Sequence, residues 1–417
     1  MKNLSAFSKI HLLLGAHIIL WLNAANYSYI GDRIPAAVKF GLVGLWLLIS
    51  LYKAEGFFHK YMMSAVSLVF FVLLCILSKL AGYEAYFDQF FMNLIYCLIM
   101  IAVFAYYYYF GTKEEIKFLL TVFVVDVLIV SVNTYLKLLS HPELSRLLST
   151  GAESKEASLG AEIPKGVGGY GLCYALVLLQ PILTFFLNKR KSSFVIKVLV
   201  YGFTMLLLFQ AQFTFALIMY PILLFLSYAY GKEKQETSKI VRAFLLMVGF
   251  LLLLNISPIL DSLIEISEYH LAERLKEVKA FLTEGDSSGS DMQARLKLYS
   301  RSVNMFLDSP IVGTFGQKGY GSHSTFLDMF AAYGLFGIFG YYGIIRTIRE
   351  TRRELVDEVE VIKTCRISVI AFVFLSIFNS VLTTEILIVI VAIIPLSLRY
   401  FTMEEKCNES NSGQLNA

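Results

Sequence analysis

The chain has 417 residues, of which 57% are hydrophobic and only 16% are charged, and its formal net charge is +4. A soluble protein of this length needs more charged side chains to cover its surface, so this composition excludes an ordinary soluble domain. The apolar residues also occur in blocks of about 17–23 residues, the length that crosses the hydrocarbon core of a bilayer.

Twelve apolar segments are predicted to span a membrane, which gives an all-α polytopic helix bundle. In chain order they lie near residues 10–25, 37–52, 62–80, 91–110, 117–138, 168–187, 193–209, 213–230, 240–260, 323–345, 367–382 and 384–400. The first segment is predicted to be an uncleaved helix rather than a signal peptide, because it has no clear cleavage site. The predicted organisation is spans one to nine within 1–260, spans ten to twelve within 323–400, and a tail at 401–417.

Basic residues are concentrated in every second short loop between these segments. The loops on the same side as the N-terminus contain Lys-Arg-Lys at 189–191 and a pair of arginines at 352–353. The loops on the other side, near 81–90 and 210–212, contain no Lys or Arg. By the positive-inside rule, both termini are predicted to be cytoplasmic.

Two segments on the outer side are too long to be simple turns, and they cover about 139–167 and 261–322. The second is predicted to be helical, and its later helix starts near Ser290 and ends before Pro310. The apolar stripe of that helix consists of Met292, Leu296, Tyr299, Val303 and Phe306. Such a helix lies on the membrane surface or packs over the mouth of the bundle.

The later part of this outer loop carries a cluster of basic residues. From 292 to 322 it contains Arg295, Lys297, Arg301 and Lys318 against the single acid Asp308. Such a cluster suits an anionic ligand, because a guanidinium group matches the geometry of phosphate oxygens. A solvated helix face, or contact with anionic lipid headgroups, would explain the same charges.

His323 follows Gly-Tyr-Gly-Ser and opens an apolar segment, so it is predicted to lie at the outer boundary of the membrane. A neutral imidazole there can accept a proton near pH 7. Ser322 is the predicted helix cap, and Asp328 is a second polar candidate for the same site. The alternative is an interfacial histidine without a function. The other histidines, His11, His17, His59, His141 and His270, have no such context.

Other signals indicate what kind of site to expect. Asp126 lies within a predicted span, where a structural hydrogen bond is favoured over a proton or substrate role. The sequence contains no Gly-rich phosphate loop with Lys-Ser/Thr, no Asp-x-Asp pair in the outer loops and no zinc-ligand spacing. We therefore expect no metal and no cofactor.

Residues 301–338 resemble the signature of the O-antigen polymerase and O-antigen ligase superfamily. The similar features are an Arg-bearing helix, a Ser-Pro-x-x-Gly turn at 309–313, and His-Ser at 323–324 opening a helix with Phe-Leu and Tyr-Gly-Leu. The Gly-Val-Gly-Gly-Tyr-Gly stretch at 166–171 resembles the Wzy-type polymerase branch.

This resemblance implies transfer of a glycan from an undecaprenyl-pyrophosphate donor, without metal, at the outer face of the bacterial cytoplasmic membrane. It implies that His323 activates the acceptor hydroxyl as a base and that Arg301 and Arg295 bind pyrophosphate. Lys297 shares a face with Arg301 and could assist it. In the short outer turn between the seventh and eighth spans, family members often carry arginine, whereas this chain has Gln212. The remaining supporting candidates are Asp328, Ser324, Lys165, Arg146 and Lys318.

The function expected from the resemblance is polymerisation of lipid-linked oligosaccharide repeat units into O-antigen, capsule or exopolysaccharide. The alternatives are ligation to the lipid A core and a twelve-helix transporter or flippase, although the sequence shows no pair of related halves. The expected partners are the lipid-linked donor and acceptor and the membrane lipids. A chain-length regulator is a further candidate partner, and nucleic acid is not expected.

Overall fold

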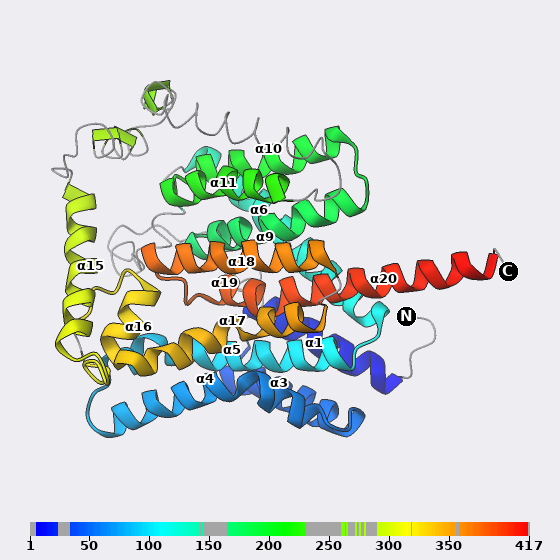
Figure 1. Ribbon diagram of the computed structural model, residues 1–417, viewed down its shortest axis with the longest axis horizontal. Coiled ribbons are helices and arrows are strands. Elements are labelled where there is room, and N and C mark those ends of the chain that lie inside the picture. Colours follow the sequence, from blue (N-terminus) through cyan, green and yellow to red (C-terminus); the bar gives the residue numbers. More distant parts are fainter. Residues whose placement is uncertain are drawn as a thin grey trace.

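The computed structural model describes residues 6–23, 34–141, 165–230, 290–317, 319–355 and 358–415, with Leu144 and a few positions between 260 and 280. Side chains are described for these residues except 229–230, 290–292 and 406–415. Every regular element of the described part is a helix, and the long helices lie side by side (Figure 1).

The helices follow the predicted spans closely. They are α1 (Ala6–Leu22), α3 (Ala36–Lys53), α4 (Phe57–Leu80), α5 (Ala85–Tyr109), α6 (Lys113–Ser140), α9 (Tyr170–Lys189), α10 (Phe194–Gln210), α11 (Thr214–Tyr230), α15 (Ser290–Asp308), α16 (Thr325–Tyr333), α17 (Gly337–Glu354), α18 (Val359–Phe378), α19 (Thr384–Ile388) and α20 (Ile394–Leu415). The predicted span at 240–260 lies outside the described residues, apart from Leu260.

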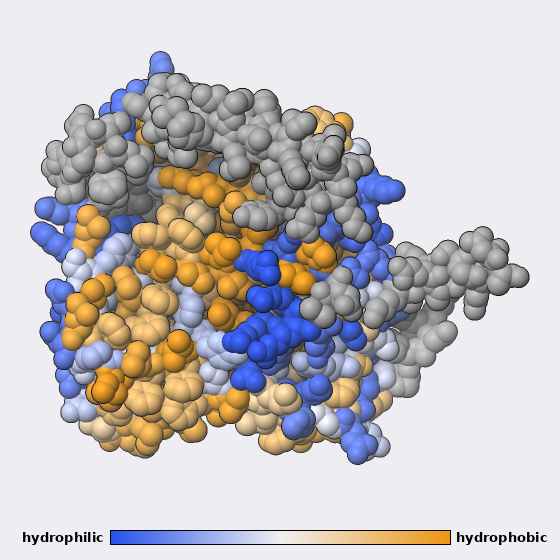
Figure 2. Space-filling view, viewed as in Figure 1, coloured by the Kyte–Doolittle hydropathy of each residue, from blue (hydrophilic) through white to orange (hydrophobic). Residues whose placement is uncertain are grey.

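Seven helices of the described part are long and apolar enough to cross a membrane, and three shorter apolar helices accompany them. The chain is therefore a multi-pass membrane protein, whereas the count of about twelve spans stays a prediction. Hydrophobic side chains cover much of one face, where a hydrophilic patch lies over the second half of α17 (Figure 2). Leu48, Leu77 and Leu128 are each more than half exposed, as lipid-facing side chains are.

The bundle has two different ends (Figure 1). Helix α15 runs across one end, which also contains the turn between α4 and α5 and the turn between α10 and α11; we call it the capped end. The opposite end contains the basic residues at 189–191 and 352–353, and we call it the basic end. The start of α1 and the end of α20 lie on the side of the basic end.

The tenth predicted span is interrupted. The span predicted at 323–345 begins at Thr325 and is divided by a 3-10 turn at Gly334–Phe336. Gly334 has a φ of 56°, and a Cβ there would lie 2.4 Å from the carbonyl carbon of Ile311. The close approach of the 310–313 turn therefore requires glycine and breaks the helix.

The last two predicted spans also differ from continuous α-helices. Helix α18 ends at Phe378, and residues 379–383 are not helical before α19 begins. A π-helical turn at Val389–Ile393 joins α19 to α20. Helix α20 continues to Leu415, so most of the predicted tail at 401–417 is the end of the last helix.

Two polar side chains within the apolar helices, Asp126 and His11, make contacts between helices. The Asn23 side-chain amide donates to Asp126 Oδ2 at 2.5 Å, so Asp126 joins α6 to the end of α1. His11 Nε2 lies 2.8 Å from Ser50 Oγ, and the His11 ring stacks on Trp46. These contacts agree with a structural role for both residues.

Helices α4 and α17 are in backbone contact. A Cβ at Gly343 would lie 2.7 Å from Leu68 Cβ and 2.9 Å from Leu68 N, and one at Gly340 would meet the ring of Phe71 at 2.6 Å. Ser67 Oγ donates to the carbonyl of Phe339 at 2.7 Å across the same interface. Small residues on α17 therefore allow this interface, as they do in other membrane helix pairs.

Replacing Gly343 by valine is expected to destabilise the fold by about 1–3 kcal/mol, the usual cost of overpacking a close contact. The matched control is Gly44→Val in α3, because a Cβ at Gly44 meets nothing within 4 Å. The measurement is thermal unfolding of the detergent-purified protein. Equal losses of stability in the two variants would contradict this account of the α4–α17 contact.

Candidate functional site

The start of α16 at the capped end positions His323. Ser324 is the N-cap: its Oγ accepts from Leu327 N at 3.1 Å and donates to the carbonyl of Ser376 at 3.1 Å. The prediction that Ser322 caps this helix is therefore wrong; Ser322 has a φ of 61° and lies in the preceding turn. This cap leaves His323 just outside the helix, with its side chain exposed.

Asp328 lies beneath this turn and is only 2% exposed. Its Oδ1 accepts from Ser302 Oγ at 2.6 Å, and its Oδ2 accepts from Ser324 N at 3.0 Å. Ser302 Oγ in turn accepts from Gly321 N at 2.8 Å. The Asp328 carboxylate thus joins α15, the 319–324 turn and α16, and it is near enough to His323 for the two charges to interact.

The turn before His323 is also held to α5. Tyr320 is buried, and its hydroxyl donates to Gln89 Oε1 at 3.1 Å. Burial and the nearby Asp328 carboxylate raise the pKa of the Tyr320 phenol, so this group stays protonated. The backbone that carries His323 is therefore fixed from two sides.

The face of α15 that packs on the bundle coincides with the predicted apolar stripe only in part. Tyr299 and Phe306 of that stripe are half-buried and contact rings of the bundle. Leu296 and Val303, two members of that stripe, are 41% and 39% exposed. Ser302 is buried instead, and a Cβ at Gly321 would lie only 2.3 Å from the carbonyl oxygen of Leu298. The hydrogen bond to Asp328 and this backbone contact decide which face turns inward.

The three predicted phosphate-binding cations do not all lie on one side of α15, and Arg295 is the one that lies apart. Arg301 is exposed beside the turn that leads to His323, and a Cβ at Gly319 would lie 4.0 Å from Arg301 Nη2. Lys297 and Arg301 both line a shallow hollow of about 520 Å³ along α15. Arg295 is half-buried on the bundle-facing side, where its charge acts on Tyr170 of α9. Arg301 is therefore the cation placed best to act with His323.

An aromatic layer lies beneath the first half of α15. The Tyr299 hydroxyl donates to the carbonyl of Phe378 at 2.7 Å. The rings of Tyr170 and Tyr174 are 4.4 Å apart, and both contact Phe213 in the turn before α11. Arg295 adjoins this layer, so a cation and several ring faces occur together at the capped end.

The break between α18 and α19 contributes polar residues that sequence reasoning missed. Thr325 joins this break to α16, because its N donates to the carbonyl of Asn379 at 3.1 Å and its Oγ1 accepts from Val381 N at 2.7 Å. Glu385 is half-buried, and a Cβ at Gly171 would lie 2.5 Å from Glu385 Oε2. The polar residues between the apolar runs 367–378 and 386–398 could have indicated this break from the sequence.

The other candidates take peripheral positions or cannot be placed. Lys165 is exposed, and its carbonyl accepts from Asn133 Nδ2 at 3.5 Å. Gln212 is half-buried in the turn between α10 and α11, with a φ of 59°. Arg146 and Lys318 lie outside the described residues. Within the described part of the chain, no three His, Cys, Asp or Glu side chains form a group that could hold a metal ion.

No protein-family model, curated protein or solved structure matches this chain. The resemblance to the O-antigen polymerase and ligase superfamily therefore stays a prediction, resting on residues 301–338 and 166–171 of the sequence.

Replacing Ser302 by alanine is expected to loosen the 319–324 turn, because Gly321 N and Asp328 both lose a buried partner. The expected cost is about 1–3 kcal/mol, and it should appear as faster amide hydrogen exchange in that turn. Ser300→Ala on the same helix is the control, because Ser300 is exposed. Unchanged exchange at 319–324 in the Ser302 variant would show that this hydrogen bond does not hold the turn.

Proposed function

We propose that this protein is a glycosyltransferase that polymerises oligosaccharide repeat units carried on undecaprenyl pyrophosphate. The observation that supports the proposal most is the position of His323 at the capped end. It is exposed, it lies beside the buried Asp328 carboxylate, and Arg301 is next in sequence to the serine that binds Asp328. A base, a carboxylate and a phosphate-binding cation thus occur around one turn of backbone.

In the proposed reaction, His323 takes the proton of an acceptor sugar hydroxyl. The hydroxyl oxygen forms a bond to the anomeric carbon of the donor glycan, and the bond from that carbon to the pyrophosphate oxygen breaks. The Asp328 carboxylate stabilises the imidazolium that forms. Arg301 binds the leaving pyrophosphate, whose negative charge grows as the bond breaks, and preplaced cations stabilise such charge by several kcal/mol.

The surroundings of His323 suit a lipid-linked glycan. The aromatic layer with Tyr170 and Tyr174 offers ring faces to sugars, and Arg295 beside it offers a second cation. The capped end is the one predicted to face outward, because the basic loops lie at the other end. Donor and acceptor lipids can reach it from the bilayer, and the same geometry would serve a ligase.

A transporter of lipid-linked sugars is the second candidate, and one observation favours it. Helix α18 is separated from α19 by non-helical backbone at 379–383, and half-buried Glu385 follows this break. Transporters place broken helices and intramembrane acids at their binding sites. Polymer formed by the purified protein without any transmembrane gradient would exclude transport as the sole activity.

Replacing His323 by alanine is expected to reduce the product in cells to single repeat units, because the acceptor hydroxyl loses its base. The measurement is polymer length on a gel, with membrane insertion checked in parallel. His141→Ala is the matched control, because His141 is also exposed at the capped end. Normal polymer length in an inserted His323→Ala protein would disprove the role of His323 as the base.

Replacing Arg301 by glutamine is expected to lower the turnover of a defined lipid-pyrophosphate donor by about 10²–10³-fold, the usual effect of losing one preplaced group that stabilises developing charge. Arg301→Lys keeps the charge and is expected to retain part of the activity. Turnover and apparent donor affinity are measured separately with purified protein. Wild-type turnover in Arg301→Gln would remove this residue from the proposed site.

A further inference from the structure

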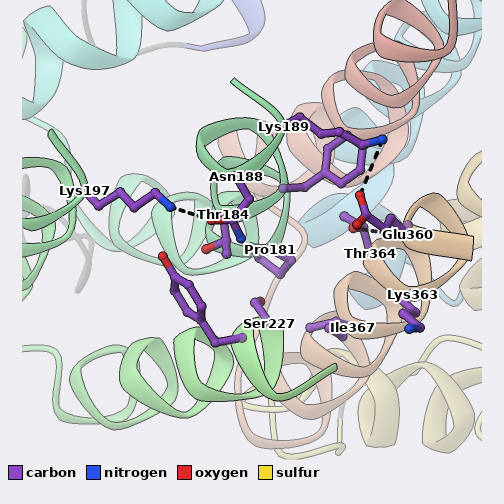
Figure 3. Close-up of a pocket in the computed structure, with 12 residues that line it drawn as sticks. Pro181, Thr184, Asn188, Lys189, Lys197, Ser227, Glu360, Lys363, Thr364 and Ile367 are labelled. Carbon is purple, nitrogen blue, oxygen red and sulfur yellow. Dashed lines mark hydrogen bonds and ion pairs between the residues drawn. The ribbon is translucent and has the colours of Figure 1, made fainter. Parts of the chain in front are cut away.

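A second polar site, drawn in Figure 3, includes Lys189 of the basic end and none of the residues around His323. It is a pocket of about 410 Å³ between α9, α10, α11 and α18. Its walls consist of Pro181, Thr184, Phe185, Asn188 and Lys189 from α9, Lys197 from α10, Ser227 and Tyr228 from α11, and Glu360, Lys363, Thr364 and Ile367 from α18. Its volume is within the range of small-molecule sites.

The pocket is positively charged. Among the described residues that line it, three lysines come from three different helices and Glu360 is the one acid, so the formal charge of this lining is +2. Lys189 pairs with Glu360 at 3.5 Å, and Lys197 Nζ donates to Asn188 Oδ1 at 2.7 Å (Figure 3). Lys189 also pairs with Glu405 of α20. Lys363 lies on the α18 side. The ligand that such a lining favours is an anion.

The floor of the pocket is built of hydrogen-bonding groups inside apolar helices. Thr184 Oγ1 lies 2.9 Å from the side-chain amide of Gln180 and 3.0 Å from the hydroxyl of Tyr201. Ser227 Oγ lies 3.1 Å from the same amide. Gln180 and Thr184 are 0% and 1% exposed. Buried polar groups within membrane helices commonly mark ligand sites.

One wall of the pocket adjoins a lipid-facing surface. On α10, Phe194 is 80% exposed, and Val195 and Leu199 are each 64% exposed. Phe194 lies three residues before Lys197 and therefore on the same side of α10, whereas Val195 and Leu199 point away from the lysine. Lys197 thus leaves the helix beside one exposed apolar side chain of the lipid-facing surface. A ligand that reaches Lys197 from this side has an anionic headgroup and apolar tails.

We infer that this pocket binds the phosphate headgroup of an anionic phospholipid, with Lys197 and Lys363 as its main cations and the Thr184 and Ser227 hydroxyls beneath it. The inference is independent of the proposed glycosyl transfer, because no residue is shared between the two sites. Basic pockets between membrane helices bind anionic headgroups by this combination of charge and hydrogen bonding.

The test is the binding of phosphatidylglycerol and phosphatidylcholine to the full-length protein in detergent, measured by native mass spectrometry. Wild-type protein is expected to retain phosphatidylglycerol preferentially. Lys197→Gln with Lys363→Gln is expected to weaken that binding about 30-fold, since each lysine near a headgroup contributes roughly 1 kcal/mol. The matched control is Lys117→Gln with Arg352→Gln, which removes two exposed charges outside the pocket.

Three outcomes would overturn the inference. The first is unchanged phosphatidylglycerol binding in the Lys197 and Lys363 variant, and the second is an equal loss in the control variant. The third is displacement of the lipid by millimolar inorganic phosphate, which would make soluble phosphate the ligand. If the double variant does not insert, Lys197→Gln alone gives the same test, with an expected loss of about 5-fold.

Discussion

Backbone N–H and C=O groups inside a bilayer need partners from the protein itself, because no water is there to supply them. This requirement determines where the chain can interrupt its helices. At the break between α18 and α19, Thr325 supplies both a donor to Asn379 and an acceptor for Val381. At the start of α16, Ser302 and Asp328 supply partners for Gly321 and Ser324. The polar side chains of the candidate site occur where the backbone needs them.

The positions of the helices could be predicted from sequence, because apolar length is a local property that the bilayer imposes. His323 and Asp328 were also found in this way, since their place at the start of an apolar segment is visible in the chain. The inward face of α15 was predicted only in part, because the buried hydrogen bond of Ser302 leaves Leu296 and Val303 of the predicted stripe exposed. Glu385 was not predicted as a site residue, because the contact that places it involves Gly171, which is distant in sequence.

The two polar regions of the molecule lie at opposite ends but share two helices. Helix α9 begins at the aromatic layer with Tyr170 and carries Thr184 and Lys189 in the basic pocket. Helix α18 carries Lys363 in that pocket and ends at Phe378 beside Tyr299. Each of these two helices therefore takes part in both polar regions, one at each of its ends.

The contact between α4 and α17 joins parts of the chain that leave the ribosome far apart in time. Ser67 of α4 donates to Phe339, and Ser64 donates to Glu350, so both hydroxyls lack these partners until the last third of the chain has been synthesised. Until then α4 presents two serines and an unfilled surface to lipid or to the insertion machinery. Assembly of the bundle is therefore completed from its C-terminal helices, and a chain halted before α17 leaves this α4 surface open to wrong partners and proteolysis.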